Sequence, residues 1–311
     1  MLRTPEVAQY RAVIGGTGFS EMVKDHEDIE TDYGVVRIGH LELGEKEVFF
    51  VSRHEKLEPP SLVNYRANIQ ALKLLGVNVI YAVSAAGRLA QEVWPGHLVA
   101  VNDVDWDDTT GRNRAMTYAQ QGLLLHASMN DPFSTGLRDI LTDAWSLAES
   151  KVRKLYTDSK DLKVGFHTSG TYFNVEGPQF STPARETRIR NTVVRGKLIG
   201  QTLVPEVQLA REMAMAYAAV GMCVDHSNFP GAPPVTHADG VMHAVNKTAH
   251  AALELVDQAI RMTPDDFFDQ VAHEAFSHSL HPSQIDLEML KNNGRTRLAF
   301  ILESVLTPTT N

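Results

Sequence analysis

A run of apolar residues at positions 79–83, VIYAV, does most to limit the fold of this chain. A strand with hardly any polar residue suits the middle of a parallel sheet, where both faces are covered. The small residues SAAG follow directly at positions 84–87. Ligands of α/β sheets bind beyond the carboxyl ends of strands, and small side chains admit a ligand close to the backbone. We therefore expect part of a binding site here.

Three more predicted strands end in residues that can carry chemistry. Residues 10–14 run into GGTG, in which glycines allow a tight turn and Thr17 adds a hydroxyl donor. A predicted hairpin, residues 35–38 and 47–52, ends in Arg53 and His54, which suit an oxyanion. Residues 220–224 end at Asp225, where a carboxyl group can be partly desolvated and hold a proton. Each of these residues could instead have an ordinary structural role, in a turn, as a surface charge or as a cap.

Between the strands, apolar residues at helical spacing predict helices over residues 63–75, 134–155, 206–219 and 237–261. Ser61 is the expected cap of the first helix. Strands alternating with helices predict an α/β fold.

The composition of the chain limits the kinds of partner that it can bind. The 311 residues carry a net charge of −9, which disfavours nucleic acid and anionic membrane surfaces. The single cysteine, Cys223, excludes disulfides within the chain and thiolate metal clusters. No apolar run approaches the roughly 20 residues of a membrane span, and the first residues do not read as a signal peptide. We expect a soluble, cytoplasmic protein.

Several common chemistries lack their motifs. The dinucleotide fingerprint, the P-loop and the serine-hydrolase elbow are absent. HEAFSH at residues 273–278 is one residue too long for the zinc motif H-E-x-x-H. Four aspartates at positions 103, 105, 107 and 108 lack supporting histidines. We expect them to cap turns and pair with Arg112 and Arg114 rather than bind a metal.

Two polar elbows lie close together between residues 170 and 206. The first is EGPQF at 176–180, and the second is GQTLVPE at 200–206, with a charged helical segment between them. They place a carboxylate, an aromatic ring and a small hydroxyl on two turns. Such a set can hold a flat polar ring beside a sugar or an anion, although most clusters of loop residues carry no chemistry.

Taken in order, these segments resemble the trimeric branch of the purine nucleoside phosphorylase superfamily, and within it the members that cleave methylthioadenosine. The similarity spans roughly residues 10 to 260, and many short motifs in one order are far more specific than any one of them. The matching segments are GGTG at 15–18, RH at 53–54, NYRAN at 64–68, AAG at 85–87, PG at 95–96, residues 103–109, His126 with DPF at 131–133, EGPQF at 176–180, Thr202 with VPE at 204–206, and Asp225.

The resemblance implies one α/β domain with a mixed, barrel-like central sheet flanked by helices, assembled as a homotrimer. It implies phosphorolysis of a purine nucleoside, with inorganic phosphate as the nucleophile and no metal or organic cofactor. The expected substrate is 5′-methylthioadenosine or a related 5′-modified adenosine. The phosphorylase domain is expected at residues 1–262, with residues 263–311 as a C-terminal extension that packs on it.

The resemblance also implies residue roles. Thr17, Arg53, His54, Ala86 and Thr202 match the phosphate site, and Asp225, Thr202 and His54 are the catalytic candidates. Phe180 matches the ring that packs on the purine, and Asp225 the acid that bonds the base near N7. His126 matches a residue that reaches across the subunit interface and contacts the sugar in a neighbouring subunit's site. His237 lies where members of the family bind the 5′ substituent.

Four positions depart from the pattern of the family. Glu55 replaces a glycine beside the phosphate site, and Arg88 replaces a small residue; the two could form an ion pair or reshape the anion pocket. Gln201 replaces a methionine that lies against the ribose. Ser227 replaces a second aspartate of aminopurine-specific members, and Asn228 beside it could take over base recognition.

These departures leave two alternatives open. One is a phosphorylase for a 6-oxopurine or a specialised biosynthetic nucleoside. The other, supported mainly by Glu55, is a catalytically weak nucleoside-binding protein.

Overall fold

A single mixed sheet forms the centre of the computed structural model, which describes residues 10–16, 23, 25–43, 46–54, 58–107, 117–232 and 238–306. The sheet has eleven strands within these residues. The strands are β1 Tyr10–Gly15, β2 His26–Thr31, β3 Gly34–Leu43, β4 Lys46–Ser52, β5 Val77–Arg88, β6 Leu98–Val101, β7 Asp103–Trp106, β8 Phe166–His167, β9 Thr171–Asn174, β10 Gly196–Gly200 and β11 Ala216–Asp225.

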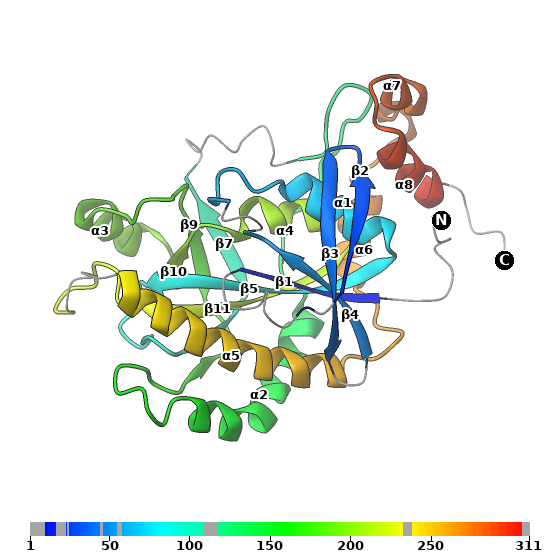
Figure 1. Cartoon of the computed structure of the whole chain (residues 1–311). Coiled ribbons are helices and arrows are strands. Elements are labelled where there is room, and N and C mark those ends of the chain that lie inside the picture. Colours follow the sequence, from blue (N-terminus) through cyan, green and yellow to red (C-terminus); the bar gives the residue numbers. More distant parts are fainter. Residues whose placement is uncertain are drawn as a thin grey trace.

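Strand β5 is the centre of the sheet, as its apolar sequence predicted. It runs parallel to β1 on one side and to β11 on the other. Its last residues leave β1 and pair antiparallel with β10. At this point Gly87 lies between Asp225 of β11 and Ile199 of β10. The sheet therefore branches at the carboxyl end of β5, which gives it the mixed, barrel-like form that was predicted (Figure 1).

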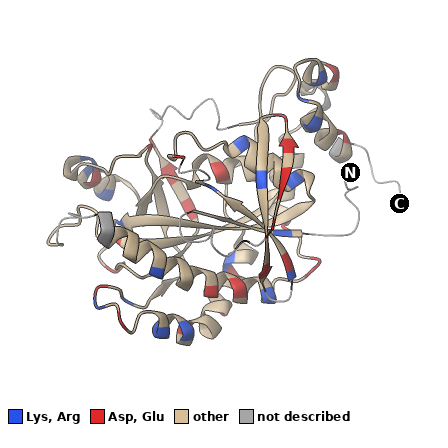
Figure 2. Ribbon diagram, in the orientation of Figure 1, with Lys and Arg blue, Asp and Glu red and all other residues tan. Residues whose placement is uncertain are grey.

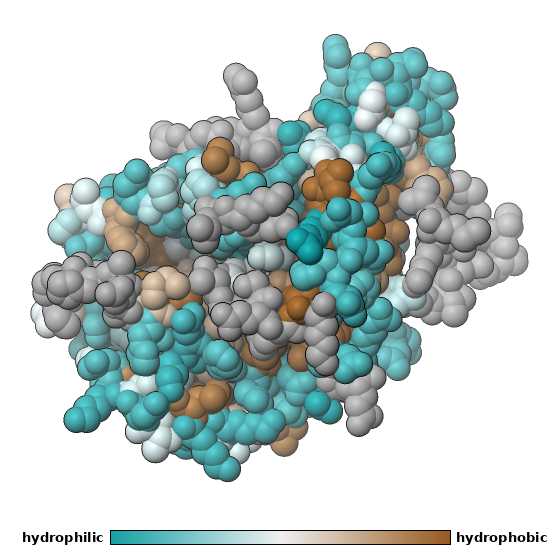
Figure 3. All heavy atoms as spheres, viewed as in Figure 1, coloured by the Kyte–Doolittle hydropathy of each residue, from teal (hydrophilic) through white to brown (hydrophobic). Residues whose placement is uncertain are grey.

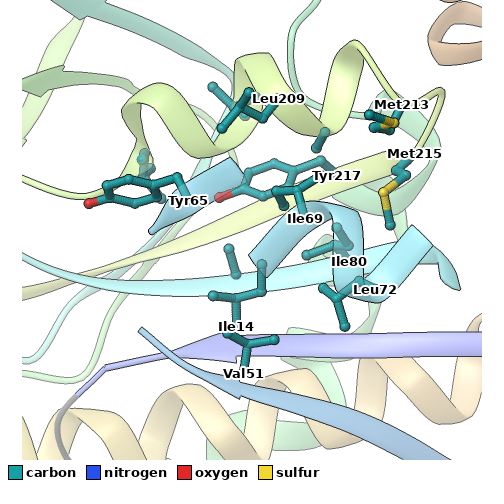
Figure 4. Close-up of a cluster of buried hydrophobic side chains, with 14 of the residues drawn as sticks. Ile14, Val51, Tyr65, Ile69, Leu72, Ile80, Leu209, Met213, Met215 and Tyr217 are labelled. Atoms are coloured by element: carbon teal, nitrogen blue, oxygen red, sulfur yellow. The ribbon is translucent and has the colours of Figure 1, made fainter. Parts of the chain in front are cut away.

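Helices cover both faces of the sheet (Figure 1). Two of them, α2 and α5, pack together and bury one set of apolar side chains against β5, β6 and β11. On the opposite face α1 and α4 enclose the larger core, where Ile69 and Leu72 of α1 meet Leu209 of α4 and Tyr217 of β11 (Figure 4). The helices are α1 Tyr65–Leu74, α2 Thr135–Leu155, α3 Pro183–Thr192, α4 Leu203–Arg211, α5 Ala238–Met262, α6 Gln270–Ser277, α7 Leu287–Asn292 and α8 Thr296–Leu306.

The helix predicted over residues 206–219 was wrong at its C-terminal end. Helix α4 ends at Arg211, and residues from Ala216 onward belong to β11. Ala214 has a left-handed backbone conformation with a φ of 52°, which ends the helical path. The alanines of this segment look helical in isolation, but all of β11 is buried in the sheet. Likewise Asn64, and not Ser61, caps α1 by accepting the N–H of Ala67.

Among the C-terminal helices, α8 contacts α1 and α7, and α6 contacts α4. Helix α8 also lies near strands β2 and β3 (Figure 1). The carboxylate of Asp32, in the turn between these strands, accepts the N–H groups of Arg297 and Leu298 at the start of α8. Arg11 of β1 reaches the carbonyls of Thr263 and Pro264 just after α5. Residues 263–306 are thus bonded to segments from the beginning of the chain.

The charged residues lie mainly on helices and outer strands, with both signs interspersed, and the central strands carry few (Figure 2). The face shown in Figure 3 is mostly hydrophilic, with hydrophobic residues in small groups. None of the described helices has the length and apolar content needed to cross a lipid bilayer.

Candidate active site

A cavity of about 210 Å³ opens at the carboxyl ends of β4, β5 and β11, at the edge where the sequence predicted a site. Helix α5 closes one side, and the two polar elbows close another. The lining residues are Gly16, Arg53, His54, Pro60, Val83, Ala85, Ala86, Gly87, Val175, Phe180, Ser181, Glu186, Ile199, Gly200, Gln201, Thr202, Met222, Val224, Asp225, Ser227, Val241, Met242 and Val245.

Arg53 lies in the wall of this cavity, but it is not an isolated cation. Its Nε and Nη2 donate to the two carboxylate oxygens of Glu206 at 2.8 and 2.7 Å, and Nη1 donates to the carbonyl of Val83 at 3.0 Å. Burial alone would lower the pKa of Arg53, but the Glu206 carboxylate raises it above its ordinary value. Arg53 is therefore held rigidly, and an anion here meets a guanidinium group whose charge is already balanced.

Glu206, which holds Arg53 in the cavity wall, was not predicted from the sequence to have a role. Its carboxylate is fully buried, and besides Arg53 it accepts the hydroxyl of Tyr217 at 2.7 Å. Its signal was present in the VPE of the second elbow, which places it in the first turn of α4. Only the fold shows that it faces Arg53, 153 positions earlier in the chain.

Thr202 ends a chain of three buried hydroxyl groups. Its Oγ1 lies 2.8 Å from Ser84 Oγ, which lies 2.9 Å from the hydroxyl of Tyr172. Although Thr202 stands at the N-terminus of α4, its side chain does not cap that helix. The hydroxyl is thus held at the cavity by side chains of β5 and β9, where it can also bond a ligand.

His54 and Ala86 also line the cavity that contains Arg53. His54 Nδ1 donates to the carbonyl of Glu58 at 2.8 Å, because a carbonyl can only accept. Ala85, the neighbour of Ala86, lines the cavity as well. Ala86 is almost fully buried, whereas Ala85 is exposed. Thr17 lies outside the described residues.

Asp225 forms the other end of the cavity. It is 8% exposed, and burial raises its pKa to about 6. The backbone N–H of Ser227, 2.6 Å from Oδ1, opposes this rise, and the nearby charge of Glu186 adds to it. A Cβ at Gly87 would lie 2.9 Å from both Asp225 Oδ1 and Ser227 Oγ, so the absence of a side chain at Gly87 lets these groups come close to β5.

Of Ser227 and Asn228, which follow this aspartate at two and three positions, only Ser227 lines the cavity. Its Oγ donates to Glu186 at 2.6 Å. The amide of Asn228 is turned away, since Nδ2 donates to Glu186 and to the carbonyl of Ser181. The structure therefore does not favour the hypothesis that Asn228 takes over recognition of the base.

The rim of the cavity carries Phe180 and Gln201. Phe180 is 66% exposed, so its ring is available to a ligand. Gln201 packs against Gly177, which has a φ of 72°, and a side chain at Gly177 would overlap it. Both elbows thus place a side chain where the sequence expected one.

Arg88 does not reshape the anion pocket. Its Nε and Nη2 donate to the carbonyls of Ala90 and Gln91, and its guanidinium group lies over the rings of Trp94 and Phe229. It is not among the cavity residues. Its expected partner Glu55 lies outside the described residues.

His126 is exposed and does not line the cavity of its own chain. His237 lies outside the described residues. The first turns of α5 supply Val241, Met242 and Val245, which make an apolar wall that was not predicted from the sequence.

The described residues contain no cluster of three or more side chains placed to bind a metal ion. In the aspartate-rich segment, Asp103 and Asp105 accept the backbone N–H of the next residue. Asp107 pairs with Arg185 and Arg188 of α3. Asp108, Arg112 and Arg114 lie outside the described residues.

Arg53 and Thr202 line one part of the cavity and the buried acid Asp225 lines another, at the strand ends of a mixed α/β sheet. The phosphorylase superfamily model matches residues 10–261. The chain belongs to this superfamily.

Relatives within the family carry two kinds of name. The chain is 36% identical over 271 residues to S-methyl-5′-thioadenosine phosphorylase of Hyperthermus butylicus, covering 84% of this chain and 90% of that protein. It is 32% identical over 263 residues to 6-oxopurine nucleoside phosphorylase of Pyrococcus furiosus, covering 81% and 92%. A methylthioadenosine phosphorylase from an antarctic soil metagenomic library is similar in structure, with a TM-score of 0.76 and 31% identity over 94% of this chain and 99% of that one.

Proposed function

We propose that the chain cleaves 5′-methylthioadenosine with inorganic phosphate, giving adenine and the methylthio-sugar 1-phosphate. The observation that carries the proposal is the joining of two ends in one cavity: Arg53 and Thr202 at one, Asp225 at the other. The names of the relatives at 33 to 36% identity support the choice of nucleoside.

Phosphate is assigned to the end beside Arg53, His54 and Thr202. Guanidinium, imidazole and hydroxyl groups there can bond its oxygens, as can backbone N–H groups. Glu206 holds Arg53 in place, and Ser84 holds Thr202. Because these two side chains are already ordered, phosphate binding costs little side-chain conformational entropy. A phosphate oxygen then attacks C1′ as the bond from C1′ to N9 breaks, and the electron pair of that bond passes to the base.

The purine is assigned to the end beside Asp225, with Phe180 against its ring. A carboxyl group whose pKa is about 6 holds its proton far more readily than an ordinary aspartate. It donates that proton to N7 as negative charge develops on the departing base. The apolar wall of Val241, Met242 and Val245 suits a methylthio group better than a free 5′ hydroxyl.

A panel of nucleosides with phosphate tests the substrate. We expect 5′-methylthioadenosine to give the highest kcat/KM, followed by adenosine, with inosine far behind. A preference for inosine would support the 6-oxopurine alternative. A Val245→Asp variant should lose the preference for methylthioadenosine over adenosine, because a charge would face the methylthio group.

The proposal includes a homotrimer in which His126 serves a neighbouring subunit's cavity. The exposed position of His126, away from its own cavity, supports this. Sedimentation equilibrium should give three chains per particle; a monomer that is active at the same concentration would contradict it.

We also place the enzyme in the cytoplasm and assign it no metal or organic cofactor, only phosphate as co-substrate. The buried, free Cys223 suits a reducing compartment. Full activity after dialysis against a chelator, and recovery in the cytoplasmic fraction, are the expected results.

A further inference from the structure

Glu186 is a buried carboxylate that the proposed reaction does not use. It lies in the first turn of α3, is 0% exposed and contributes to the cavity wall. Oε1 accepts from Ser227 Oγ at 2.6 Å and from Asn228 Nδ2 at 2.9 Å. Oε2 accepts from the backbone N–H of Asn228 at 2.9 Å and from Arg190 Nη1 at 3.4 Å. All four hydrogen bonds, from three residues, are donated to the carboxylate.

This arrangement fixes the direction of the hydrogen bond at Ser227. A serine hydroxyl has one proton and two lone pairs, so it can serve a ligand as donor or acceptor. Here the short bond to the carboxylate uses the only proton. The backbone N–H of Ser227 is also occupied, by Asp225 Oδ1. Toward the cavity Ser227 therefore offers lone pairs alone.

A hydroxyl that only accepts distinguishes the two classes of purine. Ser227 lines the cavity beside Asp225, the group assigned to N7, so it lies on the side of the base that bears the 6-substituent. A 6-amino group is a donor and can bond the lone pairs of Ser227. A 6-oxo group is an acceptor, and it would face those lone pairs without a proton between them.

We propose that Glu186 is a positioning residue that selects 6-aminopurines by holding the hydroxyl proton of Ser227 away from the base. Ser227 thereby acts as an acceptor in place of the second aspartate found in aminopurine-specific members of the family. The inference rests on the proposed function, since it concerns the same base site.

The test compares kcat/KM for 5′-methylthioadenosine with kcat/KM for 5′-methylthioinosine in four proteins: the wild type, Glu186→Gln, Ser227→Ala and the double variant. In Glu186→Gln one carboxylate oxygen becomes an amide that donates to the Ser227 hydroxyl, which can then turn its proton toward the base. We expect the ratio to fall about 10-fold in each single variant, as for one misdirected hydrogen bond.

The double variant distinguishes a positioning role of Glu186 from a general effect of the substitution on activity. If Glu186 acts through Ser227, Glu186→Gln changes the ratio no further once Ser227 is alanine, although it can lower both rates. An equal loss for both substrates in Glu186→Gln, or a full additional effect in the double variant, overturns the inference. Arg190→Lys is the matched control, because it keeps a positive charge beside Glu186 and leaves Ser227 in place; its ratio should match the wild type.

Three further outcomes have a definite interpretation. If Glu186→Gln does not fold, Ser227→Ala alone decides, and an unchanged ratio there overturns the inference. If the wild type releases no base with phosphate, the proposed function fails. If it does so but the ratio is insensitive to both substitutions, only the inference fails.

Discussion

At the scale of single residues, the cavity depends on charges that are buried together with their partners. The pair of Arg53 and Glu206 is almost completely shielded from solvent, with side chains 1% and 0% exposed. Removing one member of a buried pair leaves the other without compensation, which costs far more than breaking a pair at the surface.

Glu206→Gln should therefore destabilise the fold by about 3–5 kcal/mol, measured by urea unfolding at neutral pH. The control is Glu149→Gln, which breaks the exposed pair with Arg153 and should change the free energy of unfolding by less than about 1 kcal/mol. Similar losses in the two variants would show that Glu206 is not the partner that holds Arg53.

Asp225 should make activity depend on pH. Its protonated form donates to N7, so kcat/KM at saturating phosphate should fall as pH rises through about 6, the pKa of Asp225 in the fold. Asp225→Asn should be slow at every pH and lack this fall. A wild-type profile that is flat between pH 5 and 8 would contradict the role of Asp225 as acid.

The same shift has a consequence for stability. Between about pH 4 and pH 6 the folded chain holds a proton on Asp225 that the unfolded chain has released. The contribution of this residue to stability therefore decreases as pH rises through that window. Asp225→Asn lacks this titrating group. As pH rises from about 4 to about 6, the free energy of unfolding of Asp225→Asn should therefore increase relative to that of the wild type.

At the scale of elements, the branch at the end of β5 brings the two halves of the cavity together. Tyr172 of β9 reaches Ser84 of β5, which holds Thr202 before α4. Tyr172→Phe removes one hydrogen bond from this chain. We expect KM for phosphate to rise about fivefold, as for a loss of roughly 1 kcal/mol, with KM for the nucleoside unchanged.

Tyr156→Phe is the matched control, because it too removes one buried tyrosine hydroxyl. The hydroxyl of Tyr156 donates to the carbonyl of Gly96, and neither residue lines the cavity. Tyr156→Phe should leave both KM values unchanged. Equal effects on phosphate and nucleoside in Tyr172→Phe would show that the chain of hydroxyls supports the fold rather than the phosphate site.

We propose that residues 263–311 stabilise the phosphorylase domain without taking part in the reaction. Asp32→Ala removes the acceptor at the start of α8 and should cost about 1 kcal/mol, with faster hydrogen exchange in that helix and unchanged kcat. Asp28→Ala, on the neighbouring exposed strand β2, is the control. A large loss of kcat in Asp32→Ala would give the extension a role in catalysis.

At the scale of the whole molecule, strand ends were the part of the site that sequence could predict. An apolar run that is followed by Arg53, by the small residues 84–87 or by Asp225 reveals both the strand and the edge where it ends. The neutralising carboxylates were not predictable in this way. Glu206 and Glu186 lie in helical segments, where a glutamate usually faces solvent, and their burial depends on partners 153 and 42 residues away.

The error over residues 206–219 has the same origin, since only the sheet shows that its alanines belong to β11. The family resemblance supplied what local patterns could not: the order of the motifs and the reaction. The match of the phosphorylase superfamily to residues 10–261 confirms that part of the prediction.

In the function we propose, one cavity binds phosphate and a 6-amino nucleoside together. The most direct measurement is the release of adenine from 5′-methylthioadenosine at increasing phosphate concentration, with quantification of both products. We predict saturable dependence on phosphate, negligible release without it, and one sugar 1-phosphate for each adenine. Release of adenine at the same rate without phosphate, with free sugar as the product, would contradict the account.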